Sequence, residues 1–157
     1  MSVDLVRVDD RLIHGQVVVG WVQAMGVRRI VLVNDEVCNS QWERDLMKLG
    51  VPPDLEVEFV SVEEAAACFP EWVQDGKRTI VLLADIATLV QLYERHAPVM
   101  KVNIGGVHDD VGRKERLSYV YLTDDEVRQL RRLIDDGIAV TAQDVPTAKP
   151  VALGELV

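Results

Sequence analysis

Length, composition and charge limit what this chain can be. It has 157 residues, of which 48% are hydrophobic, and its formal net charge is −9. This length and apolar content predict a single domain over residues 1–157 with a sizeable core. The acidic balance disfavours a nucleic-acid partner, because such binding needs clustered Lys and Arg to neutralise phosphates.

Neither a membrane protein nor a disulfide-rich protein fits this sequence. No apolar run approaches the roughly 18 residues that a membrane-spanning helix needs, and the first residues lack the basic start and apolar core of a signal peptide. We therefore expect a cytoplasmic protein. The two cysteines, Cys38 and Cys68, match neither a disulfide framework nor a paired metal motif. No metal and no cofactor are predicted.

Strand-like runs alternate with helical ones along the chain. The strands are expected at Val3 to Val8, Arg29 to Val33, Leu55 to Val60, Arg78 to Leu83, Met100 to Ile104, Leu117 to Tyr121 and Gly137 to Ala142. These short strands are rich in Val, Ile and Leu on both faces, and helices separate them. The pattern predicts an α/β fold, a doubly wound and mostly parallel sheet with helices on both faces.

The helices between these strands carry start and stop signals. Gln16 to Met25 is apolar enough to form a buried helix, and Asp124 to Asp136 is amphipathic. Capping boxes are predicted at Ser61 with Glu64 and at Thr123 with Glu126, and Gly50 is predicted to end the helix that carries the stripe of Trp42, Leu46 and Leu49. The tail from Pro146 onward is expected to wrap the surface or to form a short terminal turn.

The turn after the first strand carries the strongest functional signal. Residues 8–17 read Val-Asp-Asp-Arg-Leu-Ile-His-Gly-Gln-Val. The turn lies at the carboxyl end of a strand, where open α/β sheets bind ligands, and it leads into a helix whose N-terminus attracts phosphate. The combination of His14, Arg11 and Gly15 in this place predicts chemistry on an anion.

Several other kinds of catalysis lack their usual residues. The chain has no G-x-S-x-G elbow, no phosphate-binding loop and no dinucleotide fingerprint, and its His and Cys residues are too scattered for a zinc site. What remains is an imidazole that accepts a group and releases it again. We therefore interpret His14 as the phosphoryl acceptor and Arg11 as the cation that orients the phosphate, with backbone contacts from Gly15, Gln16 and Val17.

The acidic residues of the turn and a second histidine complete the candidate site. Asp10 is expected to orient Arg11 or the imidazole, or else to cap the loop, whereas Asp9 is interpreted as structural. For His108, which follows two glycines after a strand, a place at the same edge of the sheet and an ordinary surface role both stay open.

The segment from Arg7 to Val17 resembles the opening of the IIB components of the mannose/fructose/sorbose family of sugar phosphotransferase systems (PTS). The likeness continues through residues 21–22, 33–37, 103–106 and 143–146, and so covers nearly the whole chain. In that family a IIB subunit takes a phosphoryl group from a phosphohistidine of its IIA partner and passes it to a sugar carried by the IIC and IID membrane proteins. The resemblance implies phosphorylation of His14 on Nδ1, a phosphate-orienting role for Arg11, and about seven strands with one antiparallel edge strand.

Two kinds of function stay open from the sequence. The first is a protein-N(pi)-phosphohistidine–sugar phosphotransferase that accepts phosphate from phosphorylated IIA and transfers it to a sugar imported by the IIC/IID permease, with which it associates peripherally at the membrane. The alternative is a regulatory phosphohistidine module of an incomplete phosphotransferase system, which signals rather than transports. A small-molecule enzyme that uses the same cleft is a third, weaker hypothesis. The sequence names no sugar and leaves homo-oligomer formation open.

Overall fold

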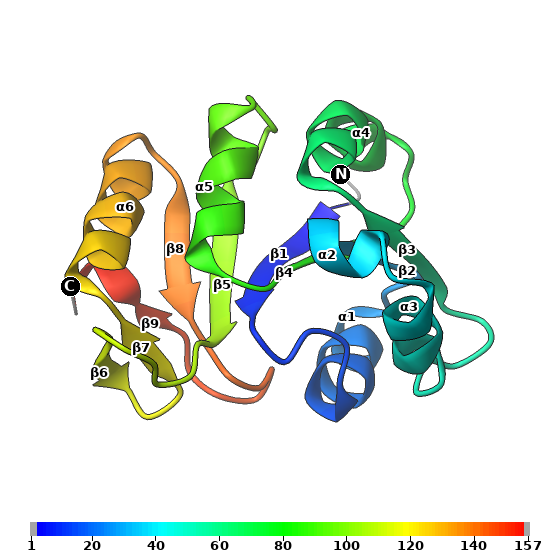
Figure 1. Cartoon of the computed structure of the whole chain (residues 1–157), viewed down its shortest axis with the longest axis horizontal. Coiled ribbons are helices and arrows are strands. Elements are labelled where there is room, and N and C mark those ends of the chain that lie inside the picture. Colours follow the sequence, from blue (N-terminus) through cyan, green and yellow to red (C-terminus); the bar gives the residue numbers. More distant parts are fainter. Residues whose placement is uncertain (1–2, 156–157) are drawn as a thin grey trace.

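Seven strands form one sheet in the order β3-β2-β4-β1-β5-β8-β9 (Figure 1). The computed structural model describes residues 3–155, with the side chains of Gln16 and Glu155 left out. The strands are β1 Val3–Asp9, β2 Arg29–Val33, β3 Glu56–Val60, β4 Thr79–Leu83, β5 Lys101–Gly106, β8 Ala139–Ala142 and β9 Val151–Ala152. All neighbouring strands are parallel except β8 and β9. The predicted α/β class with a mostly parallel sheet is confirmed.

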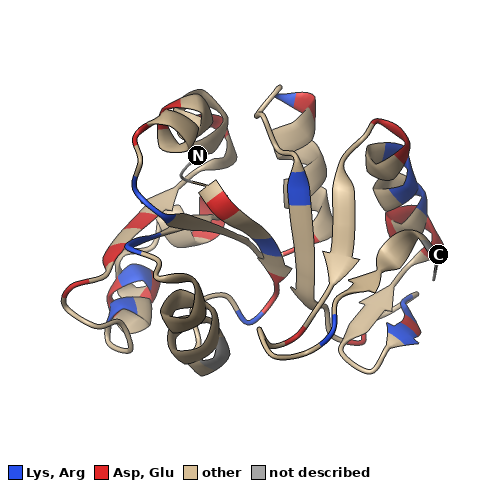
Figure 2. Cartoon of the chain, turned by 180° about the vertical axis from the view of Figure 1, so that it is seen from behind, with Lys and Arg blue, Asp and Glu red and all other residues tan. Residues whose placement is uncertain are grey.

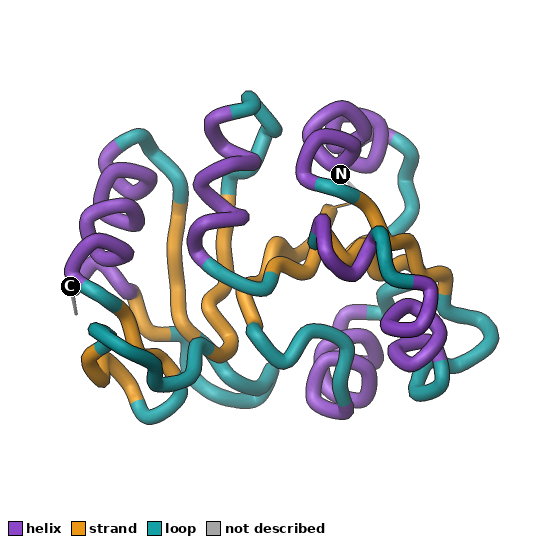
Figure 3. Tube along the Cα trace, viewed as in Figure 1, coloured by secondary structure: helices purple, strands orange, loops and turns teal. Residues whose placement is uncertain are grey.

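Helices cover both faces of the sheet, as predicted. They are η1 Gln16–Val22, α1 Gln23–Met25, α2 Asp35–Cys38, α3 Gln41–Lys48, α4 Val62–Gln74, α5 Ile86–Glu94, α6 Asp124–Asp135 and η2 Leu153–Glu155. Figures 1 and 3 show α4, α5 and α6 on one side of the sheet, with α1 and α3 on the other. Within residues 3–155, no helix has the length and apolar content needed to cross a membrane.

The predicted helix starts are correct, but one predicted apolar stripe faces solvent. Ser61 and Thr123 each accept a hydrogen bond from the backbone N–H three residues ahead. Thr123 and Glu126 complete the predicted capping box, whereas Glu64 accepts from the Ser61 hydroxyl, so the box predicted at Ser61 is incomplete. The stripe of α3 is exposed by 71% at Trp42, 52% at Leu46 and 82% at Leu49. The stripe therefore marks a helix correctly but does not contribute a face to the core.

One predicted strand lies outside the sheet. The run from Leu117 to Tyr121 is divided between β6 Lys114–Leu117 and β7 Val120–Leu122, which form a separate antiparallel hairpin. The hairpin is attached to the end of β5 through Val107, whose N–H donates to the Tyr119 carbonyl and whose carbonyl accepts from the Tyr121 N–H, both at 2.9 Å. A turn at residues 118–119 breaks what the sequence presents as one continuous run.

The seventh strand of the sheet is β9, in the tail that was expected to wrap the surface. It pairs antiparallel with β8 and forms the edge of the sheet. A two-residue strand between Pro150 and Gly154 is too short to show a period-two pattern, so no sequence signal predicts it. The predicted number of strands is right, whereas the predicted set of strands is wrong at this one place.

Strands β2 and β4 are apolar on both faces. On one side they present Val31, Val33, Val81 and Leu83 to the cluster that contains α4, α5 and α6, and on the other they present Ile30, Leu32, Ile80 and Leu82 to the cluster under η1. All eight side chains are completely buried. Figure 2 shows correspondingly that charged residues lie mainly on helices, loops and strand ends.

Strands β1 and β5 are apolar along one face, and their other face is polar toward the carboxyl ends. Val6 and Val8 of β1, like Val102 and Ile104 of β5, belong to the cluster under α4, α5 and α6. The residues that directly follow these four are Arg7, Asp9, Asn103 and Gly105, and all of them are buried. The sheet therefore carries a buried polar region on one face, directly before the carboxyl ends of β1 and β5.

Candidate active site

The site lies where the carboxyl ends of β1 and β5 meet. Strands β1 and β5 are neighbours. After β1 the chain continues to β2, toward one edge of the sheet, and after β5 it continues to β8, toward the opposite edge. This reversal of strand order is a topological switch point. The following loops converge there: the Asp10 N–H donates to the Gly106 carbonyl, and the Gln143 N–H donates to the Ile104 carbonyl, both at 3.0 Å. This is the predicted place for a ligand.

The loop after β1 is a tight turn with a strained residue. The Leu12 N–H donates to the Asp9 carbonyl at 3.0 Å, and Leu12 has a φ of 62°, a left-handed conformation that is uncommon for a residue other than glycine. Its side chain packs against the apolar cluster under η1, which holds it in place. Strain of this kind concentrates at functional sites.

His14 stands immediately before the predicted helix of residues 16–25, whose first part is unusual. The His14 carbonyl accepts a hydrogen bond from the Val18 N–H at 2.9 Å. The seven residues of η1 then form wide π turns, and the helix ends after α1 at Gly26, where the Val27 N–H donates to the Val22 carbonyl. Such π turns are rare and occur frequently at functional sites. The amides of residues 15–17 lie at the N-terminus of this helix, where N–H groups lack intrahelical partners.

Asp9 connects two side chains of the candidate site, those of His14 and Arg11. Its buried Oδ2 lies 3.1 Å from His14 Nε2 and 2.9 Å from Arg11 Nη2, and its Oδ1 accepts from Arg11 Nε at 3.0 Å. Burial alone would raise the pKa of Asp9, but the hydrogen bonds from His14 and Arg11 lower it well below its usual range. Asp9 is therefore an ionised acceptor at neutral pH.

The ionised carboxylate determines the tautomer of His14. A carboxylate without a proton only accepts hydrogen bonds, so Nε2 of His14 is the nitrogen that carries hydrogen. In the neutral ring the lone pair is then on Nδ1. The His14 side chain is 18% exposed, which leaves part of the ring accessible. The geometry thus makes Nδ1 the nucleophilic atom of this residue.

Arg11 lies next to the same carboxylate and remains cationic. Its hydrogen bond to Asp9 raises the pKa of the guanidinium above its ordinary value. One third of the side chain is exposed. The carboxylate occupies Nε and Nη2 of the guanidinium, so a cation is fixed beside the His14 ring, where charge on a phosphoryl group would need it.

Arg7 is a buried cation that sequence reasoning missed. Its side chain has no exposed surface. Nη1 donates to Asn103 Oδ1 and, at 2.9 Å, to the Gln143 carbonyl, while Nη2 donates to the Asp144 carbonyl at 2.9 Å and to Asp9 Oδ2 at 3.3 Å. Burial lowers the pKa of Arg7, and the charge of Asp9 opposes that shift. Arg7 therefore binds the Asp9 carboxylate from the buried side of the site.

Two neighbours shape the space around this arginine. The Trp21 ring lies under the guanidinium, with Cζ 4.7 Å from the ring centroid, and the Trp21 indole N–H donates to the Asp144 carbonyl at 3.3 Å. A Cβ at Gly105 would come within 2.0 Å of Arg7 Cζ. Glycine is required at this position because any side chain would occupy the place of the guanidinium.

Asp9, interpreted from the sequence as structural, makes the contacts with Arg11 and His14 that were one possibility for Asp10. The Asp10 carboxylate binds His108, with Oδ1 2.6 Å from Nδ1 and Oδ2 accepting from the backbone N–H at 2.8 Å. The contact that orients His14 and Arg11 comes from Asp9 instead. Side chains alternate along a strand, and Asp9 is the last residue of β1, so it points back under the loop toward Arg7. His108 does reach the edge of the site, through Asp10.

The family is established by comparison with known proteins. Residues 3–157 match the family described as "PTS system sorbose subfamily IIB component". The chain belongs to this family. It is a IIB component of the sugar phosphotransferase system, as the resemblance of the loop indicated, and IIB components act as phosphotransferases in sugar transport.

Individual relatives of this IIB component agree. A sorbose-specific EIIB component of Lacticaseibacillus casei is 32% identical over 147 residues, which span 94% of this chain and 90% of the relative. A mannose-specific EIIAB component of Escherichia coli (strain K12) is 27% identical over the whole chain, which corresponds to 49% of that longer protein. The crystal structure of the IIB domain of the sorbose permease from Klebsiella pneumoniae superimposes with a TM-score of 0.88 at 28% identity, over 99% of this chain and 95% of that one.

Proposed function

We propose that Nδ1 of His14 accepts a phosphoryl group from the phosphohistidine of a IIA protein and passes it to a sugar. In the first step the Nδ1 lone pair attacks phosphorus, and the bond between phosphorus and the donor imidazole breaks. In the second step a sugar hydroxyl oxygen attacks the same phosphorus, the bond to His14 breaks, and the hydroxyl proton is released. The observation that carries the proposal is the hydrogen bond from Nε2 to Asp9, which leaves the lone pair on Nδ1.

The neighbouring groups match the needs of such a transfer. When Nδ1 bonds to phosphorus, the ring gains positive charge, and the ionised Asp9 stabilises it from Nε2. Arg11 and the amides of Gly15, Gln16 and Val17 supply positive charge to the equatorial phosphate oxygens. Asp9 is therefore the residue to which we assign the orienting role. Asp10 acts by holding the loop against His108.

The family relatives support the choice of partners. The Escherichia coli mannose-specific EIIAB component is named for both IIA and IIB in one chain. This sequence matches about half of that chain. We infer that the donor here is a phosphorylated IIA protein or domain. The acceptor is a sugar held by a IIC/IID permease, and the protein works at the cytoplasmic face of the membrane.

The test is to incubate the protein with phosphoenolpyruvate, enzyme I, HPr and a IIA protein of the mannose family. We expect one acid-labile phosphate by intact mass, and phosphorus NMR should assign it to Nδ1 of a histidine. The H14A variant should accept none and should keep its fold, because His14 lies in a loop. H108A is the matched control, since it removes a histidine at the edge of the same site and should still be labelled. Label in H14A would refute the assignment.

A milder change at the same site tests Arg11. R11K keeps the positive charge but loses the planar, two-pronged contact of the guanidinium with Asp9. Charge-assisted hydrogen bonds contribute about 1.5–3 kcal/mol, so we expect acceptance of phosphate to slow by about 10- to 100-fold. Rapid-quench labelling with phosphorylated IIA measures this rate, and an unchanged rate would make Arg11 a structural residue.

The second step needs its own measurement. Membranes that contain the IIC and IID proteins of a mannose-family system are mixed with the phosphorylated protein and a radioactive sugar. Formation of sugar phosphate supports the carrier function. A protein that accepts phosphate on His14 but forms no sugar phosphate would instead act as a regulatory phosphohistidine module.

A further inference from the structure

Helix α3 presents an apolar stripe to solvent that neither the core nor the site around His14 uses. Trp42, Leu46 and Leu49 are four and three residues apart, so they share one face of the helix, and they are exposed by 71%, 52% and 82%. Large apolar side chains that are grouped in this way mark interaction surfaces, whereas an isolated exposed residue such as Val111 is ordinary. The stripe is therefore a candidate interface.

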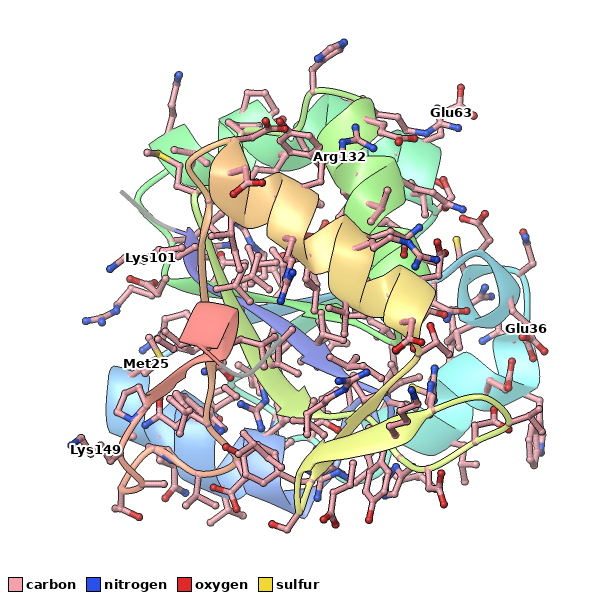
Figure 4. All side chains as sticks on the ribbon, turned by 90° about the vertical axis from the view of Figure 1, so that its left-hand side faces the viewer. Met25, Glu36, Glu63, Lys101, Arg132 and Lys149 are labelled. Atoms are coloured by element: carbon pink, nitrogen blue, oxygen red, sulfur yellow. The ribbon has the colours of Figure 1, made fainter. Side chains whose placement is uncertain are left out.

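The stripe lies away from the candidate active site. Helix α3 precedes β3, which is an edge strand of the sheet, and Lys48 Nζ lies 5.7 Å from the centroid of the Phe59 ring in β3. The site lies between β1 and β5, and β1 is three strand positions from β3, or about 14 Å. Figure 1 shows α3 at the end of the molecule opposite α6, and Figure 4, which labels Glu36 in the neighbouring α2, shows this segment at the margin. A partner on α3 therefore need not cover His14.

Two charges of opposite sign lie beside the stripe. Asp45 and Lys48 are three residues apart, so they follow one another along the same flank of α3, and both are exposed. Asp45 accepts a hydrogen bond from Gln41 at 2.7 Å, but in the described part of the chain no opposite charge forms an ion pair with Asp45 or with Lys48. A flank that carries a negative charge followed by a positive one is complementary to the same flank running in the opposite direction.

We propose that α3 pairs with α3 of a second copy of this chain in an antiparallel dimer with two-fold symmetry. When Leu46 of one copy meets Leu46 of the other, Trp42 of each copy lies against Leu49 of the other. The same register places Asp45 of each copy beside Lys48 of the other, so symmetry makes this pair of opposite charges twice. A parallel arrangement would place Asp45 against Asp45 and Lys48 against Lys48, and this repulsion selects against it.

The size and charge of this surface favour a weak dimer over a lipid surface. Three exposed side chains supply roughly half of the about 800 Å² that each partner of a standard interface buries, so the dimer is reversible. Helices that lie on membranes carry Lys and Arg on their polar face, whereas α3 carries Glu43 and Asp45 beside Arg44 and Lys48. The chain as a whole has a net charge of −9, which anionic lipids would repel.

Sedimentation velocity of the full, unphosphorylated chain tests the pairing. Between about 10 μM and about 2 mM protein we expect a monomer–dimer equilibrium with a dissociation constant of about 100 μM to 1 mM. L49D should weaken pairing by about 10-fold or more, because a charge then enters an apolar contact twice. The matched control is V111D, which changes an exposed apolar residue elsewhere and should leave the constant within about twofold. A monomer at all concentrations, or equal constants for the two variants, would overturn the proposal.

An exchange of charges tests the antiparallel register. K48E alone should weaken pairing by about 10-fold, because like charges then meet twice. The double variant D45K/K48E should return the dissociation constant to within about threefold of the wild-type value, since opposite charges meet again. Circular dichroism checks that each variant is folded. Failure of the exchange to restore pairing would refute this register, and a chain that stays monomeric but binds vesicles of phosphatidylglycerol and phosphatidylethanolamine would have a lipid surface as its partner instead.

Discussion

Strands β1 and β5 bury aliphatic side chains on one face of the sheet and charged or polar side chains on the other. Toward α5 and α6 they present aliphatic side chains, which need only be packed. Toward the opposite face they present the polar set built around Arg7 and Asp9, in which each charge needs partners of fitting geometry. The aliphatic face is stabilised by burial of area. The polar face contributes less stability and instead fixes where Asp9 stands, because a buried charge is tolerated only when its hydrogen bonds are made.

Removing the charge of Arg7 should destabilise the polar face more than any other change considered. In the R7M variant Asp9 and the Gln143 carbonyl each lose a hydrogen bond, and the Asp144 carbonyl keeps only the one from Trp21. Breaking a buried ion pair costs about 3–5 kcal/mol, and we expect that loss in the free energy of unfolding by urea. The matched control is I104V on the aliphatic face of β5, which should cost about 0.5–1.5 kcal/mol. An R7M cost no larger than that of I104V would contradict the contrast between the faces.

Adding one methyl group should disturb the polar face less, but measurably. G105A places a Cβ at 2.0 Å from Arg7 Cζ, so either the guanidinium or the strand must move. Overpacking of this kind costs about 1–3 kcal/mol. G50A is the control, because a Cβ there meets nothing within 4 Å. Thermal unfolding of the two variants should separate them clearly, and equal melting temperatures would show that Arg7 is not confined by Gly105.

The smallest expected effect is a change in acid stability. The pKa of Asp9 is lower in the folded chain than in the unfolded chain, so its contribution to stability is present above the unfolded value of about 4 and is lost as the pH falls below it. Between about pH 7 and pH 3 this group should account for about 1 kcal/mol of lost stability. Wild-type protein should therefore lose about that much more than D9N over this range in urea unfolding. Identical losses would mean that Asp9 is not held ionised by its partners.

Most of the fold could be predicted because most of the strands have strong local patterns. The bounds of β2 are reproduced to the residue, and those of β3, β4 and β8 differ by one or two residues at their starts. The β6–β7 hairpin and β9 were not predicted correctly, since their pairing depends on contacts with β5 and β8 that no local pattern encodes. Tertiary contacts decide the structure of segments this short.

The sequence pointed to the candidate residues of the loop after β1, but not to the buried residues that hold this loop in place. His14 and Arg11 lie in one short segment of distinctive composition, whereas Arg7 depends on Asn103 and on carbonyls far along the chain. A signal was nevertheless present. The sequences Val-Arg-Val-Asp in β1 and Val-Asn-Ile-Gly in β5 alternate apolar and polar residues, which distinguishes them from β2 and β4. Treating all strands as apolar on both faces concealed this difference.

The contacts of Arg7 with the loop after β8 have a consequence for how the protein matures. The residues that they join are separated by 136 and 137 positions, among the longest separations in the chain. Contacts between such distant residues close late, because the entropy of closing the intervening loop must be overcome first. A nascent chain therefore displays His14 well before the carbonyls of Gln143 and Asp144 exist to hold Arg7, and the site gains its final geometry only when synthesis has passed β8.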